Sequence, residues 1–196
     1  MKNLKQLKLV FGSLLMIVFT LQISQAQTYH LSNATSTLVV DGTSNIHDWQ
    51  INAENQQGKL TADFEEGKLT KIQQLDFSVT AESLKSGKSG MDKNTYKALN
   101  TSKHKQIVFK LTKVNSINSS GSNGYKVATT GSLMIAGSTK PIDITFDIKV
   151  EGSKITLSGS KTLKMTDFGV DPPKAMFGTI TTGDAVDIKF ESNFTK

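Results

Sequence analysis

The side chains best suited to acid–base chemistry near neutral pH are three histidines, His30, His47 and His104. Only His47 is followed by a carboxylate, in the run His47-Asp48-Trp49. Adjacent residues of a strand point to opposite faces, so His47 and Asp48 are poorly placed to act as a catalytic pair. The sequence has no Cys, no G-x-S-x-G motif and no H-E-x-x-H motif. We therefore predict a protein that is not an enzyme, with no metal site and no cofactor.

His47 and Trp49 lie two residues apart, which places them on one face of a strand. The pair is either a half-buried histidine packed beside a core tryptophan or a ligand contact at the mouth of a barrel. Residues 82–105 add six Lys against only Glu82 and Asp92. This stretch is either a solvated crossover or a basic rim. As a rim, Lys85 and Lys88 would join His47 in facing an anionic head group or making a transient contact with a membrane surface.

The basic charge of the chain does not indicate a nucleic-acid partner. The 196 residues carry a net charge of +6, but Lys2, Lys5 and Lys8 belong to the N-terminal segment. Without them, 20 Lys stand against 17 acidic residues. Every one of the basic residues is Lys, and Arg, which forms bidentate contacts with phosphate, is absent. We predict no nucleic-acid partner.

Alternation of apolar and polar residues runs through most of the chain. The clearest case is residues 142–150, where Ile142, Ile144, Phe146 and Ile148 are separated by polar residues. A period of two indicates a strand with one buried and one solvated face. Turn-forming residues separate the runs, for example at residues 65–67, 137–141 and 182–184. The pattern predicts an all-β fold, either an antiparallel sandwich or a closed barrel. Closure would remove the exposed strand edges, and about eight strands fit into the length, so we predict a single antiparallel barrel.

One segment breaks this period. Residues 91–99 place Met91, Thr95, Tyr96 and Leu99 at helical spacing, and Asn100 is suited to end a helix in the left-handed conformation. We predict one short helix within a long crossover between strands. Met91, Tyr96 and Leu99 would make it a lid over the barrel.

A barrel of about eight strands is either filled by its own side chains or holds one small ligand. Long strands, a lid-like crossover and the lack of catalytic residues favour a hollow interior. The side chains predicted to line the cavity are Trp49, Phe77, Val79, Phe109, Leu133, Ile135, Phe146, Ile148 and Phe168. We predict a binder of an apolar, lipid-like ligand. The alternative is a packed barrel that acts as a structural or protein-interaction module without a bound lipid.

Several stretches together resemble the YceI-like proteins, and the similarity spans nearly all of residues 29–194. The stretches are Asp41-Gly42-Thr43-Ser44 with His47-Asp48-Trp49, then Val79 and Leu84, Met91-Asp92 and Leu99, Ile107 and Phe109, Gly131, Leu133, Ile135, Gly137 and Thr139-Lys140-Pro141-Ile142, Lys164-Met165-Thr166-Asp167-Phe168-Gly169-Val170, and Gly183-Asp184 with Val186 and Ile188.

The resemblance implies an extended, lipocalin-like barrel of eight antiparallel strands. It also implies a periplasmic or secreted protein of a Gram-negative bacterium, and an apolar ligand such as a polyisoprenoid, since some relatives bind one inside the barrel. Many relatives carry an Arg just before the Asp-Phe-Gly stretch, where this chain has Lys164-Met165-Thr166. A contact made by that Arg would be replaced here.

The N-terminal segment predicts export from the cytoplasm. Three Lys precede an apolar run over residues 9–23, and Ser24 and Ala26 supply small residues for a signal peptidase. This run is shorter than the ~20 residues that a membrane-spanning helix needs. We predict a signal peptide over residues 1–26, cleaved after Ala26. The mature YceI-like β-barrel domain would cover residues 27–196 and work in the periplasm or outside the cell.

Overall fold

Long antiparallel strands make up most of the structure, a computed structural model that describes residues 25–196. The predicted signal peptide falls outside the described residues except for Gln25 and Ala26, which begin the first strand. The strands are β1 Gln25–Leu31, β2 Thr37–Ser44, β3 Trp49–Ala53, β4 Gln56–Glu65, β5 Lys68–Thr80, β6 Leu84–Lys85, β7 Gln106–Ser119, β8 Gly124–Ile135, β9 Ser138–Glu151, β10 Lys154–Lys164, β11 Lys174–Ala175 and β12 Ile180–Thr195.

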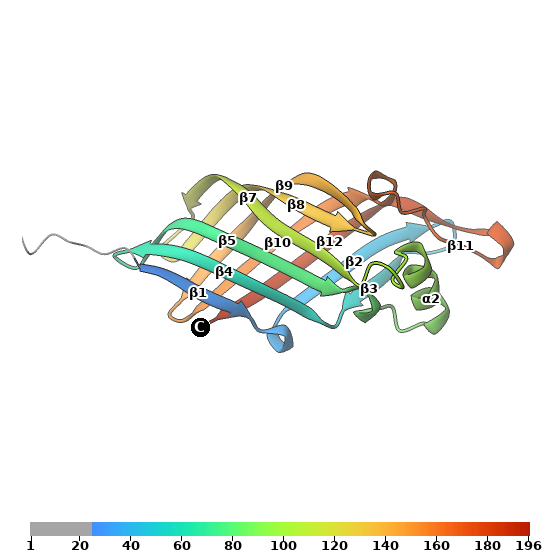
Figure 1. The fold of residues 1–196 in the computed structure, drawn as a ribbon, viewed down its shortest axis with the longest axis horizontal. Helices are drawn as coiled ribbons and strands as arrows, with labels where there is room; N and C mark the ends of the chain where they lie inside the picture. The colour runs from blue at the N-terminus through green and yellow to red at the C-terminus, as the bar shows by residue number, and fades with distance from the viewer. Residues whose placement is uncertain (1–24) are drawn as a thin grey trace, which may run out of the picture.

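Eight of these strands close into a ring. The order β1-β4-β5-β7-β8-β9-β10-β12 is completed by pairing of β12 with β1, at His30↔Thr195 and Leu31↔Phe194. Earlier in β12, over residues 182–191, the partner is instead β2, which is followed in the sheet by β3 and β6. These three strands extend the wall toward one end of the elongated barrel (Figure 1). The predicted all-β, eight-stranded antiparallel barrel is confirmed.

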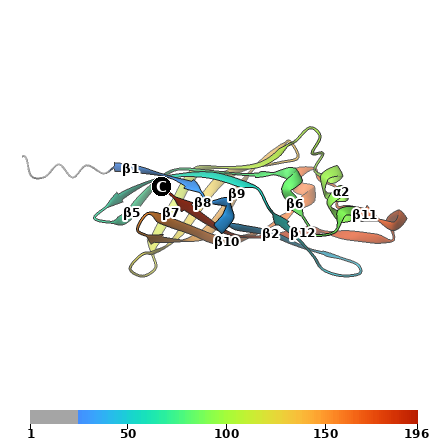
Figure 2. The same cartoon turned by 90° about the horizontal axis from the view of Figure 1, so that it is seen from below.

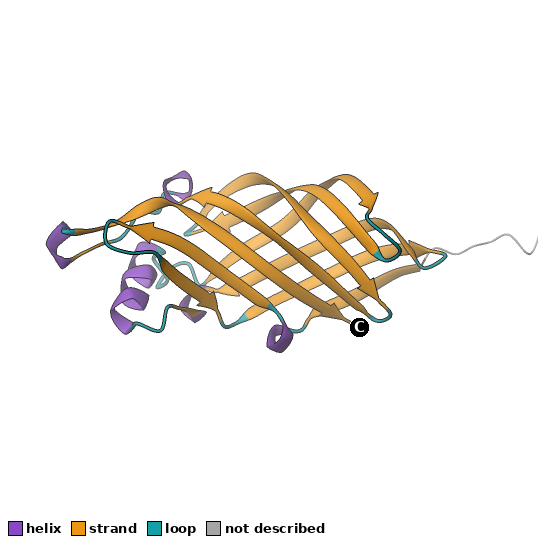
Figure 3. Cartoon of the chain, turned by 180° about the vertical axis from the view of Figure 1, so that it is seen from behind, coloured by secondary structure: helices purple, strands orange, loops and turns teal. Residues whose placement is uncertain are grey.

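Most of the helical segments lie at that same end. They are the α-helix α2 Ser89–Ala98 and the short 3-10 segments η2 Asn33–Thr35, η3 Ala81–Ser83, η4 Met165–Phe168 and η5 Met176–Gly178. All except η2 lie at the end of the barrel away from the marked C-terminus (Figure 3), and α2 and β11 lie close together in the turned view (Figure 2). The one predicted helix is confirmed, and Asn100 follows it with φ 49°.

The opposite end of the barrel is packed solid. Its cluster contains Tyr29, Leu60, Leu69, Ile72, Leu75, Tyr125, Val127, Phe146, Ile148, Ile155, Leu157 and Phe194, all nearly inaccessible to solvent. The two tyrosines fit because each hydroxyl has a partner: Tyr29 donates to the side chain of Gln27, and Tyr125 accepts from the backbone N–H of Leu69 at 2.9 Å. Burial of this cluster closes the barrel at one end and leaves the other end to the helical segments.

The wall is not continuous along its whole length. Pairing of β9 with β10 runs from Glu151↔Lys154 to Phe146↔Gly159 and stops there. The earlier part of β9 keeps only β8 as a partner, and Pro141 lies in this part. Proline has no N–H to donate, so it is tolerated where one side of a strand is unpaired. At the end that carries α2, β9 and β10 are therefore no longer hydrogen-bonded to each other.

Two of the predicted turns differ in the structure. The turn predicted at residues 137–141 is confined to Ala136 and Gly137, both with positive φ, and β9 begins at Ser138. The turn predicted at residues 182–184 is wrong, because these residues lie within β12. Glycine there accompanies an irregularity in the pairing of β12 with β2, between Thr182 and Val186, rather than a chain reversal.

Candidate functional site

An apolar chamber lies directly above the packed cluster, inside the ring of strands. Its volume is about 160 Å³. Leu75, Phe146, Leu157 and Phe194 belong to both the cluster and the chamber wall, so they form its floor. Apart from Lys161 and Ser192, every side chain that lines this inner chamber is aliphatic or a phenylalanine. Such a surface favours hydrocarbon over water.

A second, outer chamber of about 700 Å³ lies between the inner chamber and α2. Side chains from α2, η4 and the β11–β12 segment surround it, together with Trp49 and Ile51 of β3. The two chambers share the wall residues Val40, Leu84, Ile107, Ile135, Leu163 and Ile188. The two chambers therefore adjoin each other, one at the mouth of the barrel and one above its packed floor.

Two glycines make room for the aromatic side chains of this cavity. Gly42 is paired with Trp49, and a Cβ on Gly42 would lie only 2.1 Å from Cζ2 of the indole. The indole therefore lies across Gly42, and its Nε1 donates to the carbonyl of Thr43 at 2.9 Å. A Cβ on Gly131 would lie 2.1 Å from Cε2 of Phe109. Glycine at these strand positions is required by the close approach of the rings.

The helix α2 is fixed over the outer chamber by polar contacts at two points. The carboxylate of Asp92, in its first turn, accepts from the Ser86 N–H at 2.8 Å and hydroxyl at 2.6 Å, and these bonds hold its pKa below the usual range. The hydroxyl of Tyr96 accepts from Lys85 Nζ at 2.6 Å and can donate to the carbonyl of Glu82 at 2.8 Å. The bond to Tyr96 raises the pKa of Lys85.

Most residues predicted to form the site do line the cavity. Phe77, Val79, Phe109, Leu133, Ile135 and Phe146 line the inner chamber. Trp49, Phe168, Met91, Leu99, His47 and Lys88 line the outer chamber, as does Ile135. His47 is an exposed residue at the turn between β2 and β3, so it is not the half-buried core histidine that was one of the two interpretations.

Three predicted site residues lie elsewhere. Ile148 is only 2% exposed and packs in the solid cluster below the floor, because it lies further along β9 than the chamber extends. Tyr96 and Lys85 bond to each other and do not line either chamber. Tyr96 thus attaches the lid helix to the strand β6 rather than covering the cavity.

Several lining residues were missed at the level of sequence. Lys161 is the clearest: it continues the inward series of Ile155, Leu157 and Gly159 on β10, and it lines the inner chamber. Strict application of the period of two would have found it. Lys93, Lys164, Lys174 and Met176 also line the outer chamber. Lys164 ends β10 on the parity opposite to its inward series, and Lys174 and Met176 belong to a segment without regular alternation, so no pattern predicted them.

The charged side chains that line the outer chamber are all basic. Lys88, Lys93, Lys164 and Lys174 line the outer chamber, and no Asp or Glu lines it. Nearby, Asp184 is occupied by Thr166, whose N–H and hydroxyl donate to its carboxylate at 2.9 and 2.7 Å. Thr166 thus connects η4 to β12 through these two hydrogen bonds. It lies in the stretch where many YceI-like relatives carry an Arg. The mouth is suited to an anionic group.

Within residues 25–196, no group of three or more His, Cys, Asp or Glu side chains is placed to hold a metal ion. In the same residues no helix is long and apolar enough to cross a membrane.

Comparison with known proteins identifies the family. The YceI-like domain model matches residues 29–194. The chain belongs to the YceI-like family. No curated protein sequence matches it significantly.

Solved YceI-like structures share the fold at low sequence identity. BcnA of Burkholderia cenocepacia superposes with a TM-score of 0.65 at 17% identity, over 83% of this chain and 98% of BcnA. A polyisoprenoid-binding domain from Saccharophagus degradans, implicated in plant cell wall breakdown, gives 0.64 at 11% identity, over 85% of this chain and 97% of that domain. The YceI protein of Campylobacter jejuni gives 0.55 at 19% identity, over 74% and 84% of the two chains. These likenesses support the barrel, and the family supports a binding role.

Proposed function

We propose that this YceI-like protein is an exported, non-catalytic carrier that holds an apolar chain of the polyisoprenoid class inside its barrel. The observation that carries the proposal is the pair of adjoining chambers, of which the inner one is almost wholly apolar and the outer one is larger and lies under α2. A packed structural module would have no use for such a space.

The sizes of the chambers fit a chain rather than a compact ligand. An apolar cavity of about 150 Å³ in another protein stays dry and binds benzene, so the inner chamber suits the end of a hydrocarbon chain. The outer chamber falls within the range of about 300–1,000 Å³ that small-molecule sites occupy. Each methylene moved from water into such walls contributes about 0.8 kcal/mol. A tail of several carbons would therefore bind without any specific polar contact.

The polar groups of the cavity suggest how the ligand is oriented. The four mouth lysines and His47 lie at the outer chamber, while the floor is formed by buried apolar residues. A ligand with one polar end would place its tail on the floor and its head group at the mouth. The polyisoprenoid binding described for the Saccharophagus degradans domain supports this ligand class.

The geometry around His47 supports a role without catalysis. His47 Nδ1 lies 2.8 Å from the backbone carbonyl of Asp48, and the carboxylate of Asp48 is not its partner. Ser44, whose hydroxyl bonds to the carbonyl of His47 at 2.7 Å, is used to close the turn. These polar side chains stabilise the β2–β3 turn rather than one another as an acid–base set.

The test is native mass spectrometry of the mature protein purified without detergent, followed by organic extraction of any bound molecule. We expect a discrete apolar adduct on the wild type and its loss from the Phe109→Asp variant, which places a carboxylate in the inner chamber. The control is Val108→Asp, which places the same charge on the outer face of the same strand, and which should keep the adduct. A clean apo mass after incubation with isoprenoid alcohols and fatty acids would favour the packed interaction module instead.

A further inference from the structure

The mouth of the barrel also carries an exposed apolar tip. Phe177 is fully exposed, Met176 is 70% exposed and Ile46 is 58% exposed. These three are the exposed large hydrophobic residues of the described part of the chain. Met176 and Ile46 line the outer chamber, and Phe177 directly follows Met176. The exposed apolar surface is thus concentrated at the cavity entrance, whereas single exposed hydrophobic residues elsewhere would need no explanation.

The backbone of this tip is strained. Met176, Phe177 and Gly178 have φ of 50°, 58° and 91° in succession. Positive φ is favourable for glycine and tolerated by asparagine, but bulky side chains rarely adopt it. A turn chosen only for folding would carry Asn or Gly at these positions. Strain of this kind is found where a residue's function requires its side chain at that place.

The tip is held as one unit with the β2–β3 turn. The side chain of Asn45 donates to the carbonyl of Thr179 at 2.9 Å and accepts from the N–H of Thr181 at 3.0 Å. The Asn45 N–H donates to the carbonyl of Thr181 at 3.1 Å. These three bonds connect the turn that bears Ile46 to the hairpin that bears Met176 and Phe177. The apolar side chains are therefore presented together.

Lysines line the outer chamber beside this apolar tip, and no carboxylate lines that chamber. Lys174 lies two residues before Met176, and Lys88, Lys93 and Lys164 complete the basic lining of the outer chamber. Aliphatic and aromatic side chains flanked by lysine are the combination that enters the head-group region of an anionic bilayer. Three side chains are too small a surface for a second copy of the chain, since a stable protein interface buries about 800 Å² on each partner.

We propose that this end of the barrel docks on the surface of an anionic lipid bilayer. Ile46, Met176 and Phe177 enter the head-group layer, and the surrounding lysines contact lipid phosphates. The outer chamber then opens directly onto the bilayer. This contact depends on the exposed tip and the lysines, not on occupancy of the cavity, so it stands apart from the proposed carrier function.

The experiment is flotation of the mature, lipid-extracted protein with vesicles of phosphatidylcholine, with and without phosphatidylglycerol. The test variant is Met176→Asn with Phe177→Asn, because asparagine accepts the backbone conformation and should leave the thermal midpoint unchanged or higher. We expect the wild type to float with the anionic vesicles. The double variant should bind at least about tenfold more weakly, because burial of either apolar side chain changes the partition coefficient by more than a factor of about ten.

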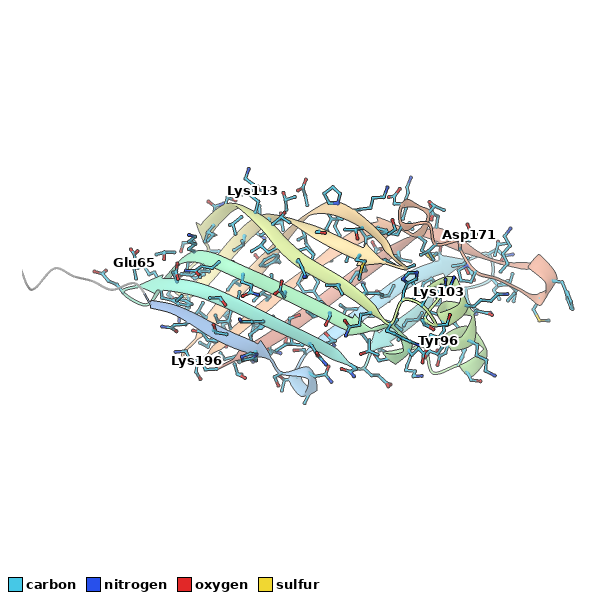
Figure 4. All side chains as sticks on the ribbon, viewed as in Figure 1. Glu65, Tyr96, Lys103, Lys113, Asp171 and Lys196 are labelled. Atoms are coloured by element: carbon cyan, nitrogen blue, oxygen red, sulfur yellow. The ribbon has the colours of Figure 1, made fainter. Side chains whose placement is uncertain are left out.

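Charge is tested separately. Lys93→Gln with Lys174→Gln should weaken binding to the anionic vesicles, whereas Lys68→Gln with Lys113→Gln should not. Lys68 lies opposite Glu65 of β4 in the strand register. Glu65 and Lys113 lie far from the mouth, whereas Tyr96 and Asp171 lie at the mouth (Figure 4). Failure of the wild type to float, or equal binding by the tip variant, would overturn the proposal. If the wild type is instead a dimer that does not bind vesicles, and the tip variant is a monomer, the tip contacts a second copy of the chain.

Discussion

Truncation of two isoleucines on one strand tests whether one end of this barrel is packed and the other end is hollow. Ile144 and Ile148 lie on the same inward face of β9, four residues apart. Ile148 is 2% exposed and packed in the solid cluster, whereas Ile144 is half-buried and lines the inner chamber. Replacement of either residue by Ala removes the same three carbons. Any difference between the two variants in the free energy of unfolding therefore reflects how tightly each side chain is packed.

The expected losses follow from those surroundings. At about 0.8 kcal/mol per carbon, full burial makes the transfer term for Ile148→Ala about 2.4 kcal/mol. Tight packing adds a term for the new cavity, so the total should reach about 3–4 kcal/mol, inside the range of about 2–5 kcal/mol seen for such changes. Ile144→Ala enlarges a space that already exists and removes a side chain that is only half-buried. We expect a loss of about 1 kcal/mol.

Urea unfolding of the two variants provides the measurement, with the midpoints compared at an unchanged slope. Affinity for an apolar ligand supplies a second readout with the opposite order: Ile144→Ala should weaken binding, and Ile148→Ala should leave it unchanged. Equal losses of stability near 3 kcal/mol would refute the reasoning, because they would show that side chains fill the chamber around Ile144 as tightly as they fill the floor.

Three more perturbations test other parts of the site. Gly42→Ala should displace the Trp49 indole, which lies 2.1 Å from the added carbon, with a destabilisation of about 1–3 kcal/mol and a red shift of the fluorescence of this single tryptophan. The pKa of Asp184 is lowered by its bonds to Thr166, so the stabilisation is present above about pH 4 and is lost as the pH falls through the folded-state pKa. Asp184→Asn should flatten this part of the stability profile in unfolding experiments, and an unchanged acid dependence would contradict it. Lys161→Met should strengthen binding of an uncharged isoprenoid alcohol relative to a fatty acid of similar length, measured by competition against a fluorescent apolar dye.

Residue alternation was sufficient to predict the strands and most of the inner chamber, and the resemblance to the YceI-like proteins favoured a closed barrel over a sandwich. Phe77, Phe109 and Phe146 face inward because each continues an apolar series of period two. The helix was also predictable, since Met91 and Leu99 break that period.

Alternation could not show where the interior is hollow. Ile144 and Ile148 have the same parity and the same residue type, yet one lines the chamber and the other lies beneath it. The difference depends on how many strands surround each level of the barrel and on which side chains reach across from other strands. Both are long-range properties, and no local pattern in the sequence encodes them.

The mouth was hardest to foresee for a related reason. Met176 and Phe177 follow Pro172-Pro173 in a segment with neither helical nor strand periodicity, and their exposure depends on hydrogen bonds from Asn45, more than 130 positions earlier in the chain. The inward position of Lys161, in contrast, was predictable from the sequence. A charged residue within an apolar series is, however, easily assigned to the solvent-facing side of the strand.

The early end of pairing between β9 and β10 has a consequence for how the barrel unfolds. From Glu151↔Lys154 to Phe146↔Gly159 the two strands pair and the wall is a closed ring around a packed core. Beyond that point, at the end that carries α2, each of the two strands pairs with only one neighbouring strand. Amides in the upper part of β9 can open to solvent without disturbing the core, so their hydrogen exchange should proceed through local fluctuations. Amides near Tyr125 and Ile148 should exchange only on global unfolding. The molecule thus combines a rigid base with an upper wall of low local stability, and a long hydrocarbon could enter without the fold as a whole being undone.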